Sequence, residues 1–343
     1  MTSDRPAPDE TTLRRAARLS VAPMMDWTDR HCRYFHRLMS REALLYTEMV
    51  AAPALVRGGA VHLLDFDPAE QPVAVQLGGS DPGELAKATR AAVAHGYGEV
   101  NLNVGCPSDR VQSGAFGAVL MKTPDLVADC VAAMMDAAEG AGGAVVTVKC
   151  RIGVDDQAPR DVLPGFLAKV RAAGVNRVTV HARKAWLQGL SPKENRDIPP
   201  LDHALVHEMK RAFPDLHLSI NGGIETLDQA RTHLDAGLDG VMIGRAAYHN
   251  PAMLLAVDAA LFGRAPSGRT AHDVARAMLP YIEAHVAAGG KVHDVTRHML
   301  GLFAGRPGAR AWRRALSAGA TAPEAGPDLV IDALARVPEA APA

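Results

Sequence analysis

The chain contains the stretches LSINGG at residues 218–223 and VMIGR at residues 241–245. Short apolar runs of this kind, bounded by turn residues, are typical of strands buried on both faces. Each run is followed by glycine, with Asn221 beside the first pair and Arg245 beside the second. Glycines let backbone N–H groups approach an anion, and barrels commonly hold a phosphate after their last two strands. The two stretches therefore predict the end of a barrel and a phosphate site, with simple tight turns as the alternative.

Six similar runs lie upstream, at residues 19–22, 44–47, 73–77, 100–104, 145–148 and 178–180. Helical patterns separate them, as parallel strands covered by helices require. Eight such units over roughly 230 residues match the size of a TIM barrel. A doubly wound sheet is the alternative, but no GxGxxG motif follows the first run. We therefore predict an α/β protein with a (β/α)8 TIM barrel over residues 19–262.

Two further segments flank the predicted barrel. Residues 1–18 combine prolines with charges and have no apolar core, so we expect a disordered tail that is neither a secretory signal nor a transit peptide. After a glycine- and proline-containing break at 263–268, helical patterns cover 272–286, 292–303 and 309–316. These predict a small helical domain over residues 270–336.

Composition narrows the class of protein. The 343 residues are 48% hydrophobic and 22% charged, which is ordinary for a globular chain and unlike a disordered or fibrous one. The apolar runs fall short of the roughly 20 residues that a membrane span needs. The four cysteines form no CxxC pair, so we expect free thiols, no metal site and a cytoplasmic protein. We see no sign of an obligate protein partner.

Charge is spread unevenly along the chain. The formal net charge is −1, but residues 291–314 carry six Lys or Arg and only one acidic residue, Asp294. That segment is therefore +5, which leaves −6 for the remainder. A concentrated basic segment of this kind suggests a polyanionic partner.

Chemically versatile side chains follow the predicted strands. They include Gln76, Lys149 and His181, which in a barrel would share the face where such enzymes have their active sites. Residues that merely cap the following helices would be Ser, Thr or Asp instead. A phosphate site here could serve a phosphosugar, a nucleotide or flavin mononucleotide (FMN). Donors of these three kinds suit an electron-rich ring with carbonyl and nitrogen edges, and a nearby cation stabilises its reduced, anionic form.

Cys106 follows the fourth predicted strand in the stretch NVGCPS at residues 103–108. An unperturbed thiol titrates near pH 8.5, so it is mostly protonated at neutral pH and can donate a proton. A nucleophilic role is the alternative, but the sequence shows no catalytic histidine beside it, and a general acid needs none. Cys32 and Cys130 lie in helical patterns and are interpreted as packing residues.

These stretches resemble the motifs of tRNA-dihydrouridine synthases over residues 20–314. The resemblance is carried by APMMDWTD (22–29), QLGG (76–79), NVGCPS (103–108), KCR (149–151), HAR (181–183), NGGI (221–224) and GR (244–245). The DusA branch of the family is most similar, through KAWL (184–187), SPKENR (191–196), RHMLGLF (297–303) and WRR (312–314).

The resemblance implies an FMN enzyme driven by NADPH that reduces D-loop uridines of tRNA. Hydride would go to C6 of uracil, and Cys106 would protonate C5. The implied FMN contacts are Pro23, Met24, Met25, Gln76, Lys149, His181, Asn221, Gly222, Gly223, Gly244 and Arg245. The implied tRNA contacts are Asn103, Lys193, Arg196, Arg310 and Arg313. No metal is implied.

Two other functions use parts of the same sequence. A flavin-dependent reductase of free pyrimidines or another small substrate would need the barrel but not the basic helices. A non-catalytic tRNA-binding chaperone would need the basic helices but not Cys106, Lys149 and His181 together. Arg310, Arg313 and Arg314 share one face of a predicted helix, which could follow a phosphate backbone or could be only a solvated surface.

Overall fold

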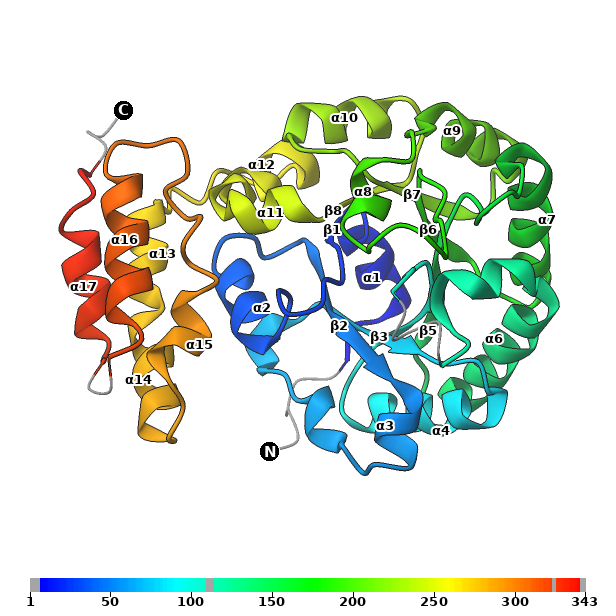
Figure 1. Ribbon diagram of the computed structural model, residues 1–343, viewed down its shortest axis with the longest axis horizontal. Helices are drawn as coiled ribbons and strands as arrows, with labels where there is room; N and C mark the ends of the chain where they lie inside the picture. The colour runs from blue at the N-terminus through cyan, green and yellow to red at the C-terminus, as the bar shows by residue number, and fades with distance from the viewer. Residues whose placement is uncertain (1–6, 109–113, 323–324, 340–343) are drawn as a thin grey trace.

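The computed structural model of the chain describes residues 7–108, 114–322 and 325–339. Eight parallel strands form a closed barrel in which each strand pairs with the next and β1 pairs with β8 (Figure 1). The strands are β1 Leu19–Val21, β2 Leu44–Ala51, β3 Val73–Gly78, β4 Glu99–Val104, β5 Val145–Arg151, β6 Arg177–His181, β7 His217–Asn221 and β8 Gly240–Ile243. The predicted TIM barrel is confirmed, and closure rules out the doubly wound sheet.

Helices form the outer layer of the barrel (Figure 1). In chain order the α-helices up to the end of the barrel are α1 Glu10–Ala16, α2 Arg30–Arg37, α3 Ala52–Val56, α4 Pro82–Ala94, α6 Pro124–Glu139, α7 Pro159–Ala172, α8 Glu194–Asp197, α9 His203–Ala212, α10 Leu227–Asp235, α11 Arg245–His249 and α12 Val257–Phe262. Short 3-10 helices are η1 Val61–Leu64, η2 Pro68–Glu70, η3 Gly117–Lys122 and η4 Pro251–Ala256.

The strands are buried on both faces, but the two faces differ in chemistry. In β4, Val100, Leu102 and Val104 pack with the core beneath the helices. The alternate residues Glu99 and Asn101 are fully buried polar side chains bonded to other strands inside the barrel. Alternation along a strand sends successive side chains to opposite faces. The interior of this barrel is therefore polar along part of its length.

The prediction of a disordered segment over residues 1–18 is wrong for residues 10–16, which form α1. The Asp9 carboxylate caps the helix by accepting a hydrogen bond from Thr12 N. Leu13 is fully buried and packs with Leu44, Tyr46, Ala74 and Met242 of the strands. By packing against the strands in this way, α1 buries apolar surface. The short, charged sequence did not suggest this burial.

A second group of helices lies beside the barrel (Figure 1). It consists of α13 Ala271–Ala277, α14 Leu279–Ala287, α15 Val292–Thr296, α16 Ala309–Gly319 and α17 Asp328–Leu334. The predicted helical stretch 272–286 is divided between α13 and α14 near Pro280, because proline lacks the N–H that a continuous helix needs. The stretch predicted at 292–303 is helical only to Thr296, and α17 was not predicted.

In the part of the chain that the structure describes, no helix is both long and apolar enough to cross a membrane.

Candidate active site

Several side chains predicted to bind a ligand meet at the carboxyl ends of neighbouring strands. Strand pairing sets Asn103 beside Lys149, and His181 beside Asn221. Gln76 near the end of β3 is joined to this group because Asn103 Nδ2 donates a hydrogen bond of 2.7 Å to Gln76 Oε1. The barrel thus gathers residues from five consecutive strands at one end.

A chain of buried hydrogen bonds supports Gln76 from inside the barrel. Gln76 Nε2 donates to Asn101 Oδ1 at 2.8 Å, and Asn101 Nδ2 donates to Thr147 Oγ1 at 2.8 Å. Thr147 Oγ1 in turn donates to Glu99 Oε1 at 2.7 Å. Breaking one link would leave a buried polar group without a partner, which is costly. The orientation of the Gln76 amide is therefore fixed.

Asn103 holds the loop that carries Cys106. Its Oδ1 accepts hydrogen bonds from Gly105 N at 3.0 Å and from Cys106 N at 2.9 Å. Its other end bonds to Gln76, and only 8% of the residue is exposed. The residue that the sequence predicted as a nucleotide contact is thus bonded at both ends of its amide to the protein.

The Cys106 thiol lies at the edge of the site and is partly exposed, unlike the buried Cys32, Cys130 and Cys150. Its sulfur is 3.4 Å from Ser108 Oγ. The backbone is pinned on both sides, since the Cys106 carbonyl also accepts a hydrogen bond from Ala118 N at 2.8 Å. Cys106 is therefore the cysteine with both a fixed backbone and access from outside.

Lys149 reaches across the barrel interior to the seventh strand. Its Nζ donates to Asn221 Oδ1 at 3.2 Å, and Asn221 Nδ2 donates to Met242 O at 2.8 Å. Burial, reinforced by the nearby Arg151, lowers the pKa of Lys149 to about 8. No carboxylate among the described residues pairs with Lys149. Among the described residues, this partly buried cation therefore has only a neutral hydrogen-bond partner.

The two glycines after β7 lie where a larger residue would not fit. Gly222 and Gly223 have φ of 109° and 72°, which favour glycine. A Cβ on Gly222 would lie 2.7 Å from the His181 ring, and one on Gly223 would meet Leu201. Burial, together with Arg151 and Lys149, holds the pKa of His181 well below its ordinary value. The neutral imidazole therefore packs directly against the Gly222 backbone.

Arg245 is the second residue after β8 and forms an ion pair of 2.8 Å with Asp197 of α8. Both side chains are largely exposed, so the pair contributes little stability. The neighbouring Gly244 lies close to the loop after β1, because a Cβ on it would be 3.6 Å from Met24 Sδ. The two halves of the predicted phosphate site therefore adjoin the predicted methionine contacts.

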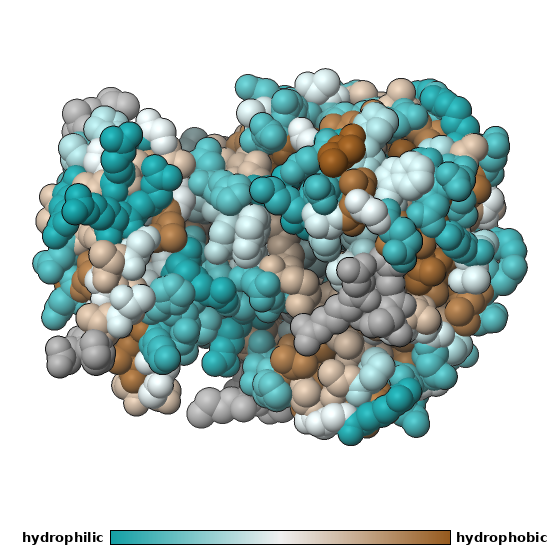
Figure 2. All heavy atoms as spheres, viewed as in Figure 1, coloured by the Kyte–Doolittle hydropathy of each residue, from teal (hydrophilic) through white to brown (hydrophobic). Residues whose placement is uncertain are grey.

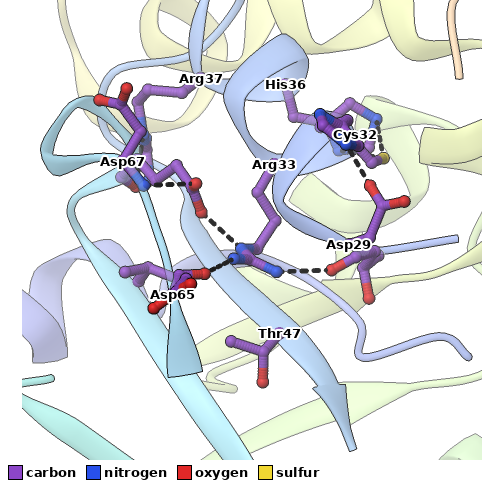
Figure 3. Close-up of polar contacts among 12 residues, drawn as sticks. Asp29, Cys32, Arg33, His36, Arg37, Thr47, Asp65 and Asp67 are labelled. Carbon is purple, nitrogen blue, oxygen red and sulfur yellow. Dashed lines mark hydrogen bonds and ion pairs between the residues drawn. The ribbon is translucent and has the colours of Figure 1, made fainter. Parts of the chain in front are cut away.

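The loop after β1 carries the predicted contacts Pro23, Met24 and Met25, of which Met25 is 51% exposed. Thr28 closes this loop, since Met24 N donates to Thr28 Oγ1 at 2.9 Å. Arg33 of α2, labelled in Figure 3, donates to Thr28 O at 2.9 Å and pairs with the buried Glu70 at 2.5 Å. A buried ion pair thus anchors the base of the loop.

Positive charge is in excess at this end of the barrel. Arg151 is only 3% exposed and bonds to the backbone carbonyls of Gly105, Lys184 and Asn195. Arg183 also bonds only to carbonyls, and its Nε is buried without a partner among the described residues. Cations without carboxylate partners favour the binding of an anion.

The predicted tRNA contacts lie in two places. Lys193 and Arg196 are exposed in and beside α8 near the barrel end, while Arg310 and Arg313 are exposed on α16. Trp312 and Leu316 form the buried face of α16. Within the described ranges, no carboxylate pairs with either of these two α16 arginines. Hydrophilic side chains predominate on the helical domain and its junction with the barrel in the view of Figure 2.

The helical domain is tied to the loop after β1. Arg297 donates to Asp26 O at 3.0 Å and pairs with Asp29 at 2.5 Å, while His298 Nε2 lies 3.0 Å from the same carboxylate. Burial alone would raise the pKa of Asp29, but hydrogen bonds from His298 and Cys32 N hold it well below its ordinary value. The loop with the predicted cofactor contacts and the helical domain are therefore one unit.

Two residues with many contacts in the site were missing from the predicted set. Both occur in the sequence analysis only inside motifs, Arg151 in KCR (149–151) and Asn195 in SPKENR (191–196). Asn195 is fully buried and bonds to Trp186 N, Trp186 O and Leu190 O. The contacts of Arg151 join segments 33 to 46 residues apart, and those of Asn195 form only when its own loop folds, so local pattern gave no signal for either residue.

Comparison with known proteins agrees with this geometry. Residues 20–338 match the family described as Dihydrouridine synthase (Dus). The chain belongs to this family. The match covers the barrel and the helical domain together, so the family assignment extends to both.

Several dihydrouridine synthases of known name are similar over nearly their whole length. The tRNA-dihydrouridine(20/20a) synthase of Shewanella oneidensis is 56% identical over 311 residues, covering 91% of each chain. That of Escherichia coli K12 is 54% identical over 323 residues, covering 94% of this chain and 91% of its own. That of Vibrio parahaemolyticus is 52% identical over 328 residues, covering 95% and 99%.

Among solved structures, an old yellow enzyme homologue from Zymomonas mobilis has a similar fold. The TM-score is 0.50 at 13% sequence identity, over 68% of this chain and 86% of that one. At this identity the likeness concerns the barrel fold alone.

Proposed function

We propose that this chain is an FMN-dependent enzyme that uses NADPH to reduce the C5–C6 double bond of uridines in the D-loop of tRNA. One observation carries the proposal: a partly exposed thiol with a fixed backbone stands at a barrel end where, among the described residues, Lys149 and Arg151 have no carboxylate partner. Membership of the dihydrouridine synthase family and the names of the similar proteins support the same reaction.

The residues present fit a flavin. Gly222 and Gly223 offer backbone where a Cβ would collide, and Arg245 beside them suits a phosphate. Lys149, with a pKa of about 8, and the neutral His181 suit the ring, since the lysine is charged at neutral pH and can stabilise a negative ring. A bound FMN would supply the hydride for C6 of the uracil ring.

Cys106 completes the reduction in this proposal. Addition of hydride at C6 leaves negative charge at C5 and O4, and the thiol gives its proton to C5. The uracil then holds one added hydride and one added proton, and the thiolate regains its proton from solvent. Asn103 keeps the donor in place through Cys106 N, and Arg151 lies against the same loop through Gly105 O. A positioned general acid typically contributes 10²–10⁴-fold to a rate.

The substrate would be held by charge outside the reacting centre. A uridine inside folded RNA is out of reach until it is extruded, at a cost of a few kcal/mol. Contacts to phosphates offset such a cost. The exposed Lys193 and Arg196 near the barrel end, with Arg310 and Arg313 on α16, are suited to those contacts.

The proposal is tested with purified protein and unmodified tRNA. We expect protein with a flavin spectrum that NADPH bleaches, and tRNA that gains two hydrogens per modified uridine by mass spectrometry. Free uridine should not be reduced at a comparable rate. Comparable turnover of free uridine would favour a small-molecule reductase, and colourless protein that binds tRNA without reducing it would favour a non-catalytic chaperone.

A further inference from the structure

Trp186 is unusually exposed for its size. It is 37% exposed, whereas its neighbours Ala185 and Leu187 are buried. Among the described residues, it is the one aromatic side chain in the set of exposed large hydrophobics. A tryptophan left in water loses the stabilisation that burial would give, so its exposure calls for a binding role.

The backbone of Trp186 is held rigidly by a buried amide. Asn195 Oδ1 accepts from Trp186 N at 2.7 Å, and Asn195 Nδ2 donates to Trp186 O at 2.9 Å. The same Nδ2 donates to Leu190 O at 3.1 Å. Asn195 is fully buried, so these bonds do not compete with water. An exposed ring on a fixed backbone can bind with little loss of conformational entropy.

Arg151 connects Asn195 and the Trp186 loop to the loop that carries Cys106. Its Nε donates to Gly105 O at 2.9 Å, directly before Cys106. Its NH1 donates to Lys184 O at 2.9 Å and to Asn195 O at 3.0 Å. Two buried side chains, Arg151 and Asn195, therefore set the position of the Trp186 backbone relative to the Cys106 loop.

A cation lies against the Trp186 ring. The Lys184 ammonium lies over the indole ring, 5.1 Å from its centroid, and is held there by hydrogen bonds to Asp155 O at 2.5 Å and Gln157 O at 3.2 Å. A cation on one face leaves the other face for a flat ligand. Lys193 and Arg196 are exposed on the same segment. An exposed aromatic ring with a cation beside it and further cations on the same segment is an arrangement that binds single-stranded nucleic acids.

We propose that Trp186 is a stacking platform for the nucleobase next to the uridine that reaches Cys106. The inference rests on the proposed function, because it needs RNA as the substrate. Arg151 and Asn195 are positioning residues that keep the platform in register with the thiol. Stacking is tolerant of base identity, so Trp186 contributes affinity and placement without reading the sequence.

The test combines variants of Trp186 with altered RNA. Unmodified tRNA is made with an abasic nucleotide on the 5′ side or the 3′ side of the target uridine, and turnover is measured with wild-type protein, Trp186→Ala and Trp186→Phe. Ile198→Ala serves as the matched control, because Ile198 is a 60% exposed apolar residue of the same segment. The rate of cofactor reduction by NADPH is measured for each protein.

We expect Trp186→Ala to raise the Michaelis constant for tRNA roughly tenfold, as loss of one stacked base does, with NADPH reduction unchanged. Trp186→Phe should recover most of the loss, and Ile198→Ala should behave as wild type. At one flanking position, the abasic nucleotide should weaken wild type but not Trp186→Ala, because both changes remove the same contact.

Fully additive effects at both flanking positions would overturn the proposal, as would a normal Michaelis constant in Trp186→Ala. Slower NADPH reduction with unchanged tRNA affinity would instead assign the ring to the nicotinamide. Failure of the proposed function is a separate result, because wild-type protein would then form no dihydrouridine on any tRNA.

Discussion

The two ends of the barrel differ in how their buried charges are paired. At the amino end, Glu99 and Arg177 are both buried and form an ion pair, and Tyr46 OH and Thr147 Oγ1 each donate to Glu99 at 2.7 Å. At the carboxyl end, the hydrogen bonds that Lys149 and Arg151 form with the described residues all go to neutral groups. Charges that satisfy one another specify the fold, whereas charges left without a counterion are available to a ligand.

The largest expected effect is on catalysis at the carboxyl end. Cys106→Ala should lower uridine turnover by 10²–10⁴-fold, because it removes the proton donor, while bound flavin and its reduction by NADPH persist. Turnover is measured under single-turnover conditions with unmodified tRNA. Cys130→Ala is the control, since that thiol is buried in α6. Wild-type turnover by Cys106→Ala would contradict the role of this thiol.

At the amino end, breaking the buried ion pair should cost a comparable free energy, but of unfolding rather than of catalysis. Glu99→Gln leaves Arg177 buried without its counterion, which typically costs about 3–5 kcal/mol of unfolding free energy. Urea unfolding measures it. Glu84→Gln, which breaks an exposed pair with Arg57, should cost under about 1 kcal/mol. Equal losses in the two variants would show that burial of the first pair is not what matters.

A smaller effect is expected outside the barrel. Arg310→Ala combined with Arg313→Ala should raise the Michaelis constant for tRNA and reduce the log–log salt slope by roughly one unit per lost phosphate contact. Cofactor reduction should be unchanged. Arg276→Ala is the matched control, because this exposed arginine of the same domain already pairs with Asp273 and Glu339. An unchanged salt slope in the double variant would identify the arginine face as a solvated surface.

Much of the barrel and of its carboxyl end could be predicted from the sequence, for physical reasons. The eight strands were predictable because buried parallel strands need apolar runs. The turn after the seventh strand was predictable from Gly222 and Gly223, which have positive φ. The position of Lys149 and His181 at one end of the barrel was predictable because strand ends converge there. These signals are local in sequence, so one chain suffices to find them.

The remainder depends on contacts that local pattern does not encode. Helix α1 was missed although Asp9 is a capping residue, because its stability comes from Leu13 packing inside the barrel. Arg151 was missed because it bonds to backbone far away in sequence, and Asn195 was missed because its bonds form only when the loop that contains it folds. The buried chain from Glu99 to Gln76 was missed because its partners come from different strands.

We infer that the cations at the carboxyl end of the barrel are available to bind an anionic cofactor. The most direct test is the FMN dissociation constant of wild type and Lys149→Met from about pH 7 to about pH 9, around the Lys149 pKa of about 8. As the pH rises through this value, the free lysine loses its proton and its attraction for the ring, so wild-type affinity should fall. Lys149→Met should bind roughly 10- to 100-fold more weakly at pH 7 and show no such decline. Equal affinity and equal pH dependence in the two proteins would contradict the claim.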